Sequence, residues 1–517
     1  MWGSNARSAH PIFFHHLLKG VRNGAKMYVI DPRRTESAQW ADVWLGIDVG
    51  SDIALANTVG REIIAAGLVD ESFVSHSTSG FEGYRENVEA WTLERGETVT
   101  GIPADVIKQM AHDYATAETA QICWTLGITE HHTATDNVLA LISLALLTGH
   151  VGRYGSGLVP LRGQNNVQGG GDMGALPNKL PGFQDVENDQ LRGKFEARWG
   201  AEIPAKAGKH LSLMFEAMQD NELTSLFIIG ENPAQSEADV SHTIELLKGL
   251  EFMVVQDMFL TATAELADVV LPAAAGWVET EGTTTNSERR VQRVRKALEP
   301  PGQAKDDLDI ISLLADRMGF GWGTPTAEEV WDELRSLSPM HAGMSYQRLE
   351  ALGGIQWPCP DNQHPGTQYL HGWLWEDPMS REPAPFLPAE WAPPIDPLSD
   401  EFPLRMTTGR RLDGYNTGVQ SGGYRSPLDR GGLIEVAPED GAALGVSEGD
   451  TVRVSSRRGS IDVSVRFDDG LRPGLSFMPV HYPDEADVNQ LTIDAWDPKS
   501  GTAEFKATAI RIDLVGG

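Results

Sequence analysis

Cysteine is scarce, because the 517 residues contain only Cys123 and Cys359. Iron–sulfur sites and structural zinc sites need about four ligands, mostly thiolates, so this pair alone builds neither. Cys123 lies in the apolar run Gln-Ile-Cys-Trp-Thr-Leu, which favours a buried small hydrophobic side chain over a ligand. Cys359 lies between two prolines and is predicted to be a loop thiol.

Positive charge and long apolar runs are also lacking. With 42 Lys and Arg against 73 Asp and Glu, the net charge is -31. This argues against nucleic acid or an anionic membrane as a partner, because both demand basic faces. No run of about 18 apolar residues occurs, so no membrane span is expected. The opening residues 1–5 have no export-signal features, and a cytoplasmic location is expected for the chain as given.

Apolar runs and helical patterns alternate over much of the chain, which predicts α/β architecture with parallel sheets covered on both faces. The predicted strands are 27–30, 43–47, 121–126, 225–229, 252–255 and 268–271. The predicted helices are 11–20, about 52–66, 104–115, 136–147, 237–248, 307–318 and 327–337, with a further helix after Thr261.

Other stretches lack this alternation. Residues 177–209 are expected to be an irregular surface excursion, and 279–292 a polar loop that is either solvated or suited to phosphate. In the last block, alternation at 451–455, 460–467 and 475–480 predicts a small mixed barrel. The predicted domains are 1–164, 165–340 and 398–517, with a surface linker at 341–397.

Carboxylates stand where several predicted strands end. Asp31 and Asp52 do so in the first α/β unit, and Asp257 does so in the second. Doubly wound sheets hold a nucleotide at this edge, although an Asp at such a turn also serves as a helix cap. Two halves of this kind suggest two nucleotide-like groups, one in each half.

The stretch from Pro160 to Gly174 is the least like ordinary core or surface. Its five glycines permit close backbone approach to a bound group, and its amide side chains offer uncharged donors and acceptors. Arg162 offers a rigid fork that grips a carboxylate or phosphate in two places. The stretch is predicted to be a ligand cradle, and the alternative is an ordered loop that satisfies its own backbone.

The adjacent histidines His131 and His132 invite a metal-binding interpretation. Neighbouring side chains on an extended chain point to opposite sides, so one metal is not expected to take both.

The string Pro-Leu-Arg-Gly-Gln-Asn-Asn-Val-Gln-Gly from Pro160 closely resembles the active-site segment of formate dehydrogenase catalytic subunits. These are molybdopterin oxidoreductases of the dimethyl sulfoxide reductase family, and the likeness runs from residue 2 to about 512. It implies two Rossmann-like parallel-sheet domains and a C-terminal double-psi-type β-barrel. It also implies that Arg162 lies beside the metal and holds the substrate carboxylate, with Gln164 as a second catalytic residue.

The resemblance further implies two molybdopterin guanine dinucleotides with molybdenum or tungsten between them. No residue of this chain is expected to bind the metal. The residues implied in cofactor binding are Trp2, Gly3, Ser4, Asn5, His10, Asp31, Pro32, Arg33, Thr35, Gly50, Ser51, Asp52, Leu126, Gly127, Glu130, Gly163, Glu231, Asn232, Gln256, Asp257, Thr408, Gly409, Arg410, Tyr415, Asn416, Thr417, His481, Asn489 and Lys506.

Two departures from the family pattern stand out. Glu130 replaces a frequent glutamine, and a carboxylate sits poorly beside phosphates. The family's four-cysteine [4Fe-4S] segment, and the Cys or selenocysteine metal ligand that follows it, do not occur before Trp2. The chain is therefore expected to be a fragment, one product of a split gene, or a protein with a misplaced start, and an upstream UGA codon for selenocysteine is one hypothesis.

The implied activity of the complete enzyme is oxidation of formate to carbon dioxide. The implied partners are formate and an iron–sulfur electron-transfer subunit. Two alternatives remain: another oxidoreductase of the family, such as a nitrate or sulfoxide reductase, or a non-catalytic cofactor carrier or assembly protein.

Overall fold

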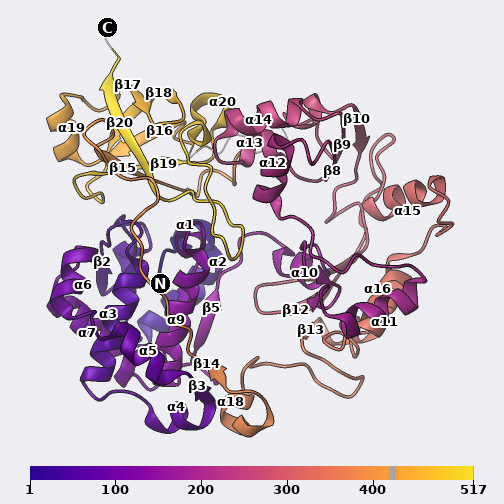
Figure 1. Ribbon diagram of the computed structural model, residues 1–517, viewed down its shortest axis with the longest axis horizontal. Coiled ribbons are helices and arrows are strands. Elements are labelled where there is room, and N and C mark those ends of the chain that lie inside the picture. The colour runs from indigo at the N-terminus through magenta and orange to yellow at the C-terminus, as the bar shows by residue number, and fades with distance from the viewer. Residues whose placement is uncertain (419–426, 428, 516–517) are drawn as a thin grey trace. The chain divides into compact units, whose positions relative to one another are not determined.

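The computed structural model describes residues 1–418, 427 and 429–515, which form two compact units (Figure 1). The first unit contains Met1–Leu161, Gln235–Thr243 and His371–Gly517. The second contains Arg162–Ala234 and Ile244–Leu370. The chain therefore leaves the first unit and returns to it twice.

The first unit contains the predicted parallel sheet, with one strand, β5, that the sequence analysis missed. The pairs are β1 (Tyr28–Ile30) with β2 (Val43–Leu45), and β4 (Gln121–Trp124) with β5 (Gly157–Pro160). Trp2 forms parallel bridges to both Ile30 and Trp124, so it continues the sheet between β1 and β4. A cavity of about 540 Å³ lies beside Trp2, lined mainly by apolar side chains.

Helices cover both faces of this sheet, as predicted. They are α1 (Ala6–Ala9), α2 (Pro11–Arg22), α3 (Asp52–Ala65), α4 (Glu71–Ser77), α5 (Phe81–Val88), α6 (Leu93–Thr100), α7 (Ala104–Thr116), α8 (Leu126–Thr129) and α9 (Ala134–Thr148). Successive strand residues point to opposite faces. Val29 accordingly joins a cluster with Phe14 of α2, whereas Ile30 joins the larger cluster that contains α3 and α9.

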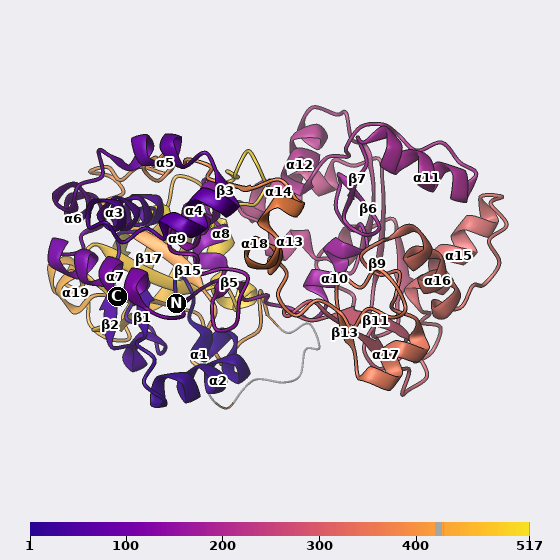
Figure 2. The same ribbon diagram turned by 90° about the horizontal axis from the view of Figure 1, so that it is seen from below.

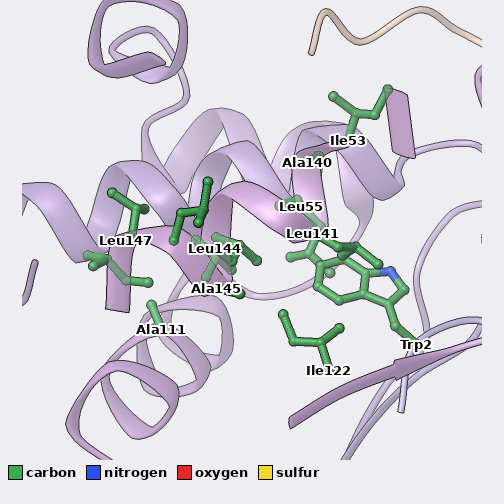
Figure 3. Packing of buried hydrophobic residues seen from close by; sticks show 14 of the residues in the cluster. Trp2, Ile53, Leu55, Ala111, Ile122, Ala140, Leu141, Leu144, Ala145 and Leu147 are labelled. Carbon is green, nitrogen blue, oxygen red and sulfur yellow. The ribbon is translucent and has the colours of Figure 1, made fainter. Parts of the chain in front are cut away.

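The larger cluster is the main core of the first unit. Leu141, Leu144 and Ala145 of α9 are at most 1% exposed, and they lie with Trp2 and Ile122 in Figure 3. A helix that is apolar around most of its circumference must be buried on most sides, and α9 packs against α3, which also contacts α7 (Figures 1 and 2). Each large side chain buried here contributes about 1.5–3 kcal/mol.

A late segment of the chain completes this core. β14 (Ala384–Pro385) pairs in parallel with β3 (Thr78–Ser79). Trp375 of α18 (Trp373–Glu376) lies 4.8 Å from Phe73 between ring centroids, and Phe386 lies 5.1 Å from Tyr84. Leu374, Phe386 and Ala389 are buried members of the same cluster as α9.

The C-terminal part of the first unit is a closed six-stranded barrel, which confirms the predicted fold class. Its strands follow the order β15 (Leu404–Gly409), β19 (Leu475–Pro479), β16 (Leu433–Val436), β18 (Ser460–Phe467), β17 (Thr451–Ser455) and β20 (Thr508–Leu514). β15 with β19 and β16 with β18 are parallel, and the other pairs are antiparallel. β18 alternates exposed and buried residues, with Ile461, Val463 and Val465 inside.

The second unit contains the second predicted parallel sheet, in the order β10 (Val269–Pro272), β9 (Phe252–Asp257), β8 (Ser225–Ile229). The helices that belong to this unit include α12 (Leu211–Gln219), α15 (Asp307–Arg317) and α16 (Ala327–Leu337), and most of α14 (Val240–Lys248). Asp257 closes β9, so the predicted strand was two residues too short. The segment after Thr261 forms one 3₁₀ turn, Ala264–Leu266, rather than the predicted helix.

Two predicted irregular stretches are in fact ordered. Residues 177–209 contain α11 (Asp189–Trp199), which was missed because it lacks an apolar stripe. Its caps were readable signals: the Asn188 side chain accepts two backbone N–H bonds, and Gly200 ends the helix at φ +64°. The predicted polar loop contains the antiparallel strands β11 (Gly282–Thr285) and β12 (Arg290–Val294), with β13 (Ile355–Gln356) beside β12.

Two glycines at adjacent turns of the first sheet touch backbone to backbone. A Cβ on Gly127 would lie 2.6 Å from the Gly3 Cα, and a Cβ on Gly3 would lie 2.7 Å from the Gly127 carbonyl carbon. Gly3 also has φ +55°, which other residues adopt only at a cost. Both turns carry implied cofactor residues, so this close approach fixes one side of the candidate site.

We expect Gly127→Ala to destabilise the cofactor-free protein by about 1–3 kcal/mol, because the added methyl group has no room. The measurement is the first thermal unfolding transition. Gly157→Ala is the matched control, since a Cβ there meets nothing within 4 Å. Equal transition temperatures for the two variants would show that the Gly3–Gly127 contact does not matter.

Candidate functional site

Buried carboxylates stand at the carboxyl ends of the strands in the first unit, as predicted. Asp31 follows β1 and accepts a hydrogen bond of 3.0 Å from the Arg33 backbone N–H. Burial raises the pKa of Asp31 to about 6, although Arg33 opposes this shift. Asp52 begins α3, and its Oδ1 accepts a hydrogen bond of 2.8 Å from the Trp2 indole. Burial also raises the pKa of Asp52, while the charge of His131 opposes the shift.

The turn after Trp2 is held by hydrogen bonds to the turn after β1. The Asn5 amide donates to Glu36 (2.7 Å) and accepts from the Ser37 hydroxyl (3.0 Å). Thr35 is buried, and its hydroxyl accepts from the Ala38 backbone N–H. The other implied residues at these turns are His10 at the start of α2, Pro32 after β1, and Gly50 and Ser51 before α3.

Arg33 joins the first sheet to the barrel. Its Nη2 donates to Glu435 Oε2 at 3.1 Å, and its guanidinium lies 3.3 Å from the centre of the Phe477 ring. Glu435 also lies 4.0 Å from the Arg411 guanidinium. A buried arginine needs such a partner, because an unpaired buried charge costs several kcal/mol.

Glu504 organises the junction between α8, α9 and the C-terminal segment. It is fully buried, and its Oε1 accepts backbone N–H bonds from Lys506 (2.8 Å) and Ala507 (3.1 Å). Its Oε2 lies 3.3 Å from the Nδ1 atoms of both His131 and His132. The expectation that these histidines point to opposite sides is therefore wrong, because they lie in a turn rather than on an extended chain.

The two sides of this ion pair have opposite pKa shifts. Burial lowers the pKa of His131, but the charge and hydrogen bond of Glu504 outweigh burial and raise it above 6.5. Burial raises the pKa of Glu504, but the two histidines hold it well below its usual range. Both groups are therefore charged in a shared pH range. The sequence analysis did not single out Glu504, although it lies two residues before Lys506.

Lys506 lies next to Glu504 and contacts two further implied residues. Its Nζ is 2.6 Å from Glu130 Oε2 and donates to the Thr408 carbonyl oxygen at 3.1 Å. Arg410 Nη1 lies 3.9 Å from Glu130 Oε1. Leu126 and Gly127 lie on α8, the short helix that precedes Glu130.

The loops of the barrel contain the remaining implied residues of the first unit. The Arg410 Nε donates to the Asn416 side chain at 2.9 Å, and His481 Nδ1 donates to the Asn416 carbonyl oxygen at 2.6 Å. The Thr417 carbonyl accepts from Gln235, and the buried Asn489 donates to the Ser236 carbonyl. Gly409 ends β15, and Tyr415 is 57% exposed.

The second unit carries the other implied residues at its own strand ends. Asn232 accepts from the backbone N–H and the hydroxyl of Thr263, at 3.0 and 2.7 Å. Gln256 is fully buried and donates to Asp307 at 2.6 Å. Asp257 accepts from the Phe259 backbone N–H at 2.9 Å. Glu231 follows β8 in the turn that contains Gly230.

The predicted cradle is only partly a loop, because α10 (Val167–Asp172) begins inside it. Two of its amides bind protein rather than face a ligand: Asn166 accepts from the Thr285 backbone N–H, and Gln168 donates to Asp172. Arg162 and Gly163 are exposed, and Gln164 is half-buried. Arg162 belongs to the second unit, whereas Asp31 and Asp52 belong to the first.

Among the implied residues, Ser4 Oγ, Arg33 Nε and Gln256 Oε1 are buried polar atoms without a hydrogen-bond partner in the described part of the chain. A buried orphan atom costs about 1–3 kcal/mol, so a bound polar group is a physical reason for it. In the first unit, Ser4 Oγ and Arg33 Nε fit a nucleotide-type group with many donors and acceptors, together with the strand-end carboxylates and the glycine turns. In the second unit, Gln256 Oε1 fits a group of the same kind.

Comparisons with known proteins agree along the chain. A family model described as molybdopterin oxidoreductase matches residues 1–317, and one described as "Molydopterin dinucleotide binding domain" matches 404–509. F420-dependent formate dehydrogenase 2 subunit alpha of Methanococcus maripaludis is 41% identical over 521 residues, covering 100% of this chain and 76% of that protein. Formate dehydrogenase H of Escherichia coli is 38% identical over 521 residues, covering 100% of this chain and 72% of that protein.

A solved structure, acetylene hydratase from Pelobacter acetylenicus, matches with a TM-score of 0.74 and 20% identity. It covers 97% of this chain and 75% of that chain, and it shows the fold alone. Within the described residues, no helix is long and apolar enough to cross a membrane.

Because His131 and Glu504 form a buried ion pair, we expect His131→Gln to lower stability, and breaking such a pair typically costs about 3–5 kcal/mol. Because the pKa of His131 is raised in the folded protein, its contribution to the free energy of unfolding is complete below pH 6.5. This contribution is lost as the pH rises through the pKa of His131 in the folded protein. Because the pKa of Glu504 is lowered in the folded protein, its contribution to the free energy of unfolding is complete above pH 4.5 and is lost as the pH falls below that value.

The difference in unfolding temperature between wild type and His131→Gln should therefore be largest between pH 4.5 and 6.5 and shrink toward pH 9. Thermal unfolding at a series of pH values measures it. His15→Gln, at an exposed position of α2, is the control. A difference that grows with rising pH would contradict the assignment.

Proposed function

The chain belongs to the molybdopterin oxidoreductase family, and we propose that it is a formate dehydrogenase catalytic subunit that oxidises formate to carbon dioxide. The observation that carries this proposal is the Pro160–Gly169 string, with Arg162 exposed and Gln164 half-buried just before α10. Both relatives named above carry formate dehydrogenase in their names and match the whole length of this chain, which supports the same substrate.

The proposed cofactor is a pair of molybdopterin guanine dinucleotides with molybdenum or tungsten. The first would be held by the turns after Trp2, β1 and β2, where Asp31 and Asp52 are buried. The second would be held by Glu231, Asn232, Gln256 and Asp257 of the second unit. When bound, the cofactor would supply the two-electron redox chemistry that formate oxidation needs.

The residues of this chain would bind and orient the substrate. The Arg162 guanidinium carries two parallel N–H donors that match the two oxygens of formate. Gln164, two residues further, offers an uncharged amide that can donate to the same carboxylate. Fixing both oxygens leaves one orientation for the C–H bond of formate.

The two electrons released by formate oxidation would need an acceptor after each turnover. The proposed exit is a [4Fe-4S] cluster, and the proposed partner is an iron–sulfur electron-transfer subunit. Cys123 and Cys359 are both buried and lie in different units, so they give no support to a cluster held by this chain alone.

Purified protein should contain molybdenum or tungsten and should reduce a dye when formate is added. Metal analysis and the dye assay on the same sample test this. Metal without formate-dependent reduction would favour another oxidoreductase of the family. Absence of both metal and reduction from protein made in a host that supplies the cofactor would favour a non-catalytic role.

In the active enzyme, Arg162→Lys should lower kcat/KM for formate roughly 10- to 100-fold. Lysine keeps the positive charge but loses the two-point contact with the carboxylate, and a charge-assisted hydrogen bond is worth about 1.5–3 kcal/mol. Steady-state kinetics with formate measures the loss. The control is Arg295→Lys, at an exposed arginine paired with Glu350 in the same unit. Kinetics equal to wild type for Arg162→Lys would remove Arg162 from the mechanism.

A further inference from the structure

Lys506 is a nearly buried cation that directly contacts the Glu130 carboxylate. Its side chain is 8% exposed. Among the described residues, Lys506 forms an ion pair with Glu130, at 2.6 Å. Glu504 is closer in sequence but does not serve as the counter-ion, because both its oxygens are taken by backbone N–H groups and the two histidines. Glu130 is thus the carboxylate in direct contact with the Lys506 ammonium group, whose charge also acts on the buried Asp31.

Arg410 approaches the same carboxylate from the barrel. Its Nη1 lies 3.9 Å from Glu130 Oε1, and its Nε is oriented by the Asn416 side chain at 2.9 Å. Exposure rises from Lys506 (8%) through Glu130 (14%) to Arg410 (28%). The three charges therefore form a short row that opens to solvent at Arg410, and one carboxylate faces two cations.

The backbone of Glu130 is held by two hydrogen bonds. The Glu130 carbonyl accepts from the Phe505 N–H at 3.2 Å, and the Glu130 N–H donates to the Leu126 carbonyl at 2.9 Å. These bonds hold residue 130 in place beside Lys506. A carboxylate that leaves the cations can do so by rotating its side chain toward the open end, with no backbone movement.

We propose that Glu130 is an internal counter-ion that fills the anion site of Lys506 and Arg410 in the cofactor-free protein, and that a phosphate of the dinucleotide binds there by displacing it. This inference rests on the proposed function for the identity of the ligand. Glu130 stabilises the empty site and weakens anion binding, because a phosphate and a carboxylate compete for the same two cations.

Glu130→Gln separates these two effects. The amide keeps the shape of the side chain but removes its charge, so Lys506 loses its counter-ion while the site becomes free for an anion. Asp136→Asn is the matched control. It also removes one negative charge, six residues after Glu130, from an ion pair with the exposed Lys499. Inorganic pyrophosphate is the probe, with binding measured by calorimetry on full-length protein prepared without cofactor.

We expect Glu130→Gln to bind pyrophosphate roughly tenfold more tightly than wild type and Asp136→Asn. Its unfolding temperature without pyrophosphate should fall below that of both proteins, and pyrophosphate should raise it more than it raises theirs. If Glu130→Gln does not fold, Glu130→Asp, whose shorter side chain reaches Lys506 less well, is measured with the same expected sign of change in affinity. Pyrophosphate affinity equal to or weaker than that of Asp136→Asn would overturn the proposal.

This outcome is independent of the formate assay. If Glu130→Gln binds pyrophosphate more tightly but the enzyme has no formate activity, the proposed role of Glu130 stands and formate as the substrate is rejected. If binding is unchanged but the enzyme oxidises formate, formate stands as the substrate and the proposed role of Glu130 is rejected.

Discussion

The buried carboxylate of Glu504 is the contact on which the arrangement of the first unit's polar residues depends. It binds the turn at His131 and His132 on one side and the backbone of Lys506 and Ala507 on the other. Because these contacts fix the backbone at Lys506, they also fix where its ammonium group can reach. Residues more than 370 positions apart in sequence are thereby brought to one place, which hydrophobic packing alone would not align to within a hydrogen bond.

Glu435 is a second buried carboxylate that joins distant segments of the chain. This buried carboxylate takes Arg33 from the turn after β1 and Arg411 from the barrel. The stack of Arg33 on Phe477 keeps its guanidinium plane fixed. In a chain with a net charge of -31, Lys506 and Arg410 thus share the Glu130 carboxylate, and Arg33 pairs with Glu435. A bound anion therefore meets positive charge that is already partly balanced.

Periodicity predicted much of the fold. β8 and α16 have the predicted bounds, and the barrel and both parallel sheets are present. The polar hairpin of β11 and β12 was not predicted, because threonine and arginine on both faces give no alternation. α10 was hidden by its three glycines, which seldom occur inside helices.

The site was predictable only in its local parts. The carboxylates at strand ends follow from the topology of parallel sheets, so Asp31 and Asp52 could be assigned from their positions alone. The meeting of His131 and His132 at one carboxylate could not, because it depends on a turn geometry and on a residue more than 370 positions later.

The late segment that completes the core of the first unit has a consequence for synthesis on the ribosome. Phe73 and Tyr84 gain their aromatic partners, Trp375 and Phe386, only after the whole second unit has been translated. At about 5–20 residues per second, the chain between these partners takes roughly 15 to 60 s to emerge. During that delay the nascent first unit presents an uncovered apolar surface, which is the kind of surface that holding chaperones bind.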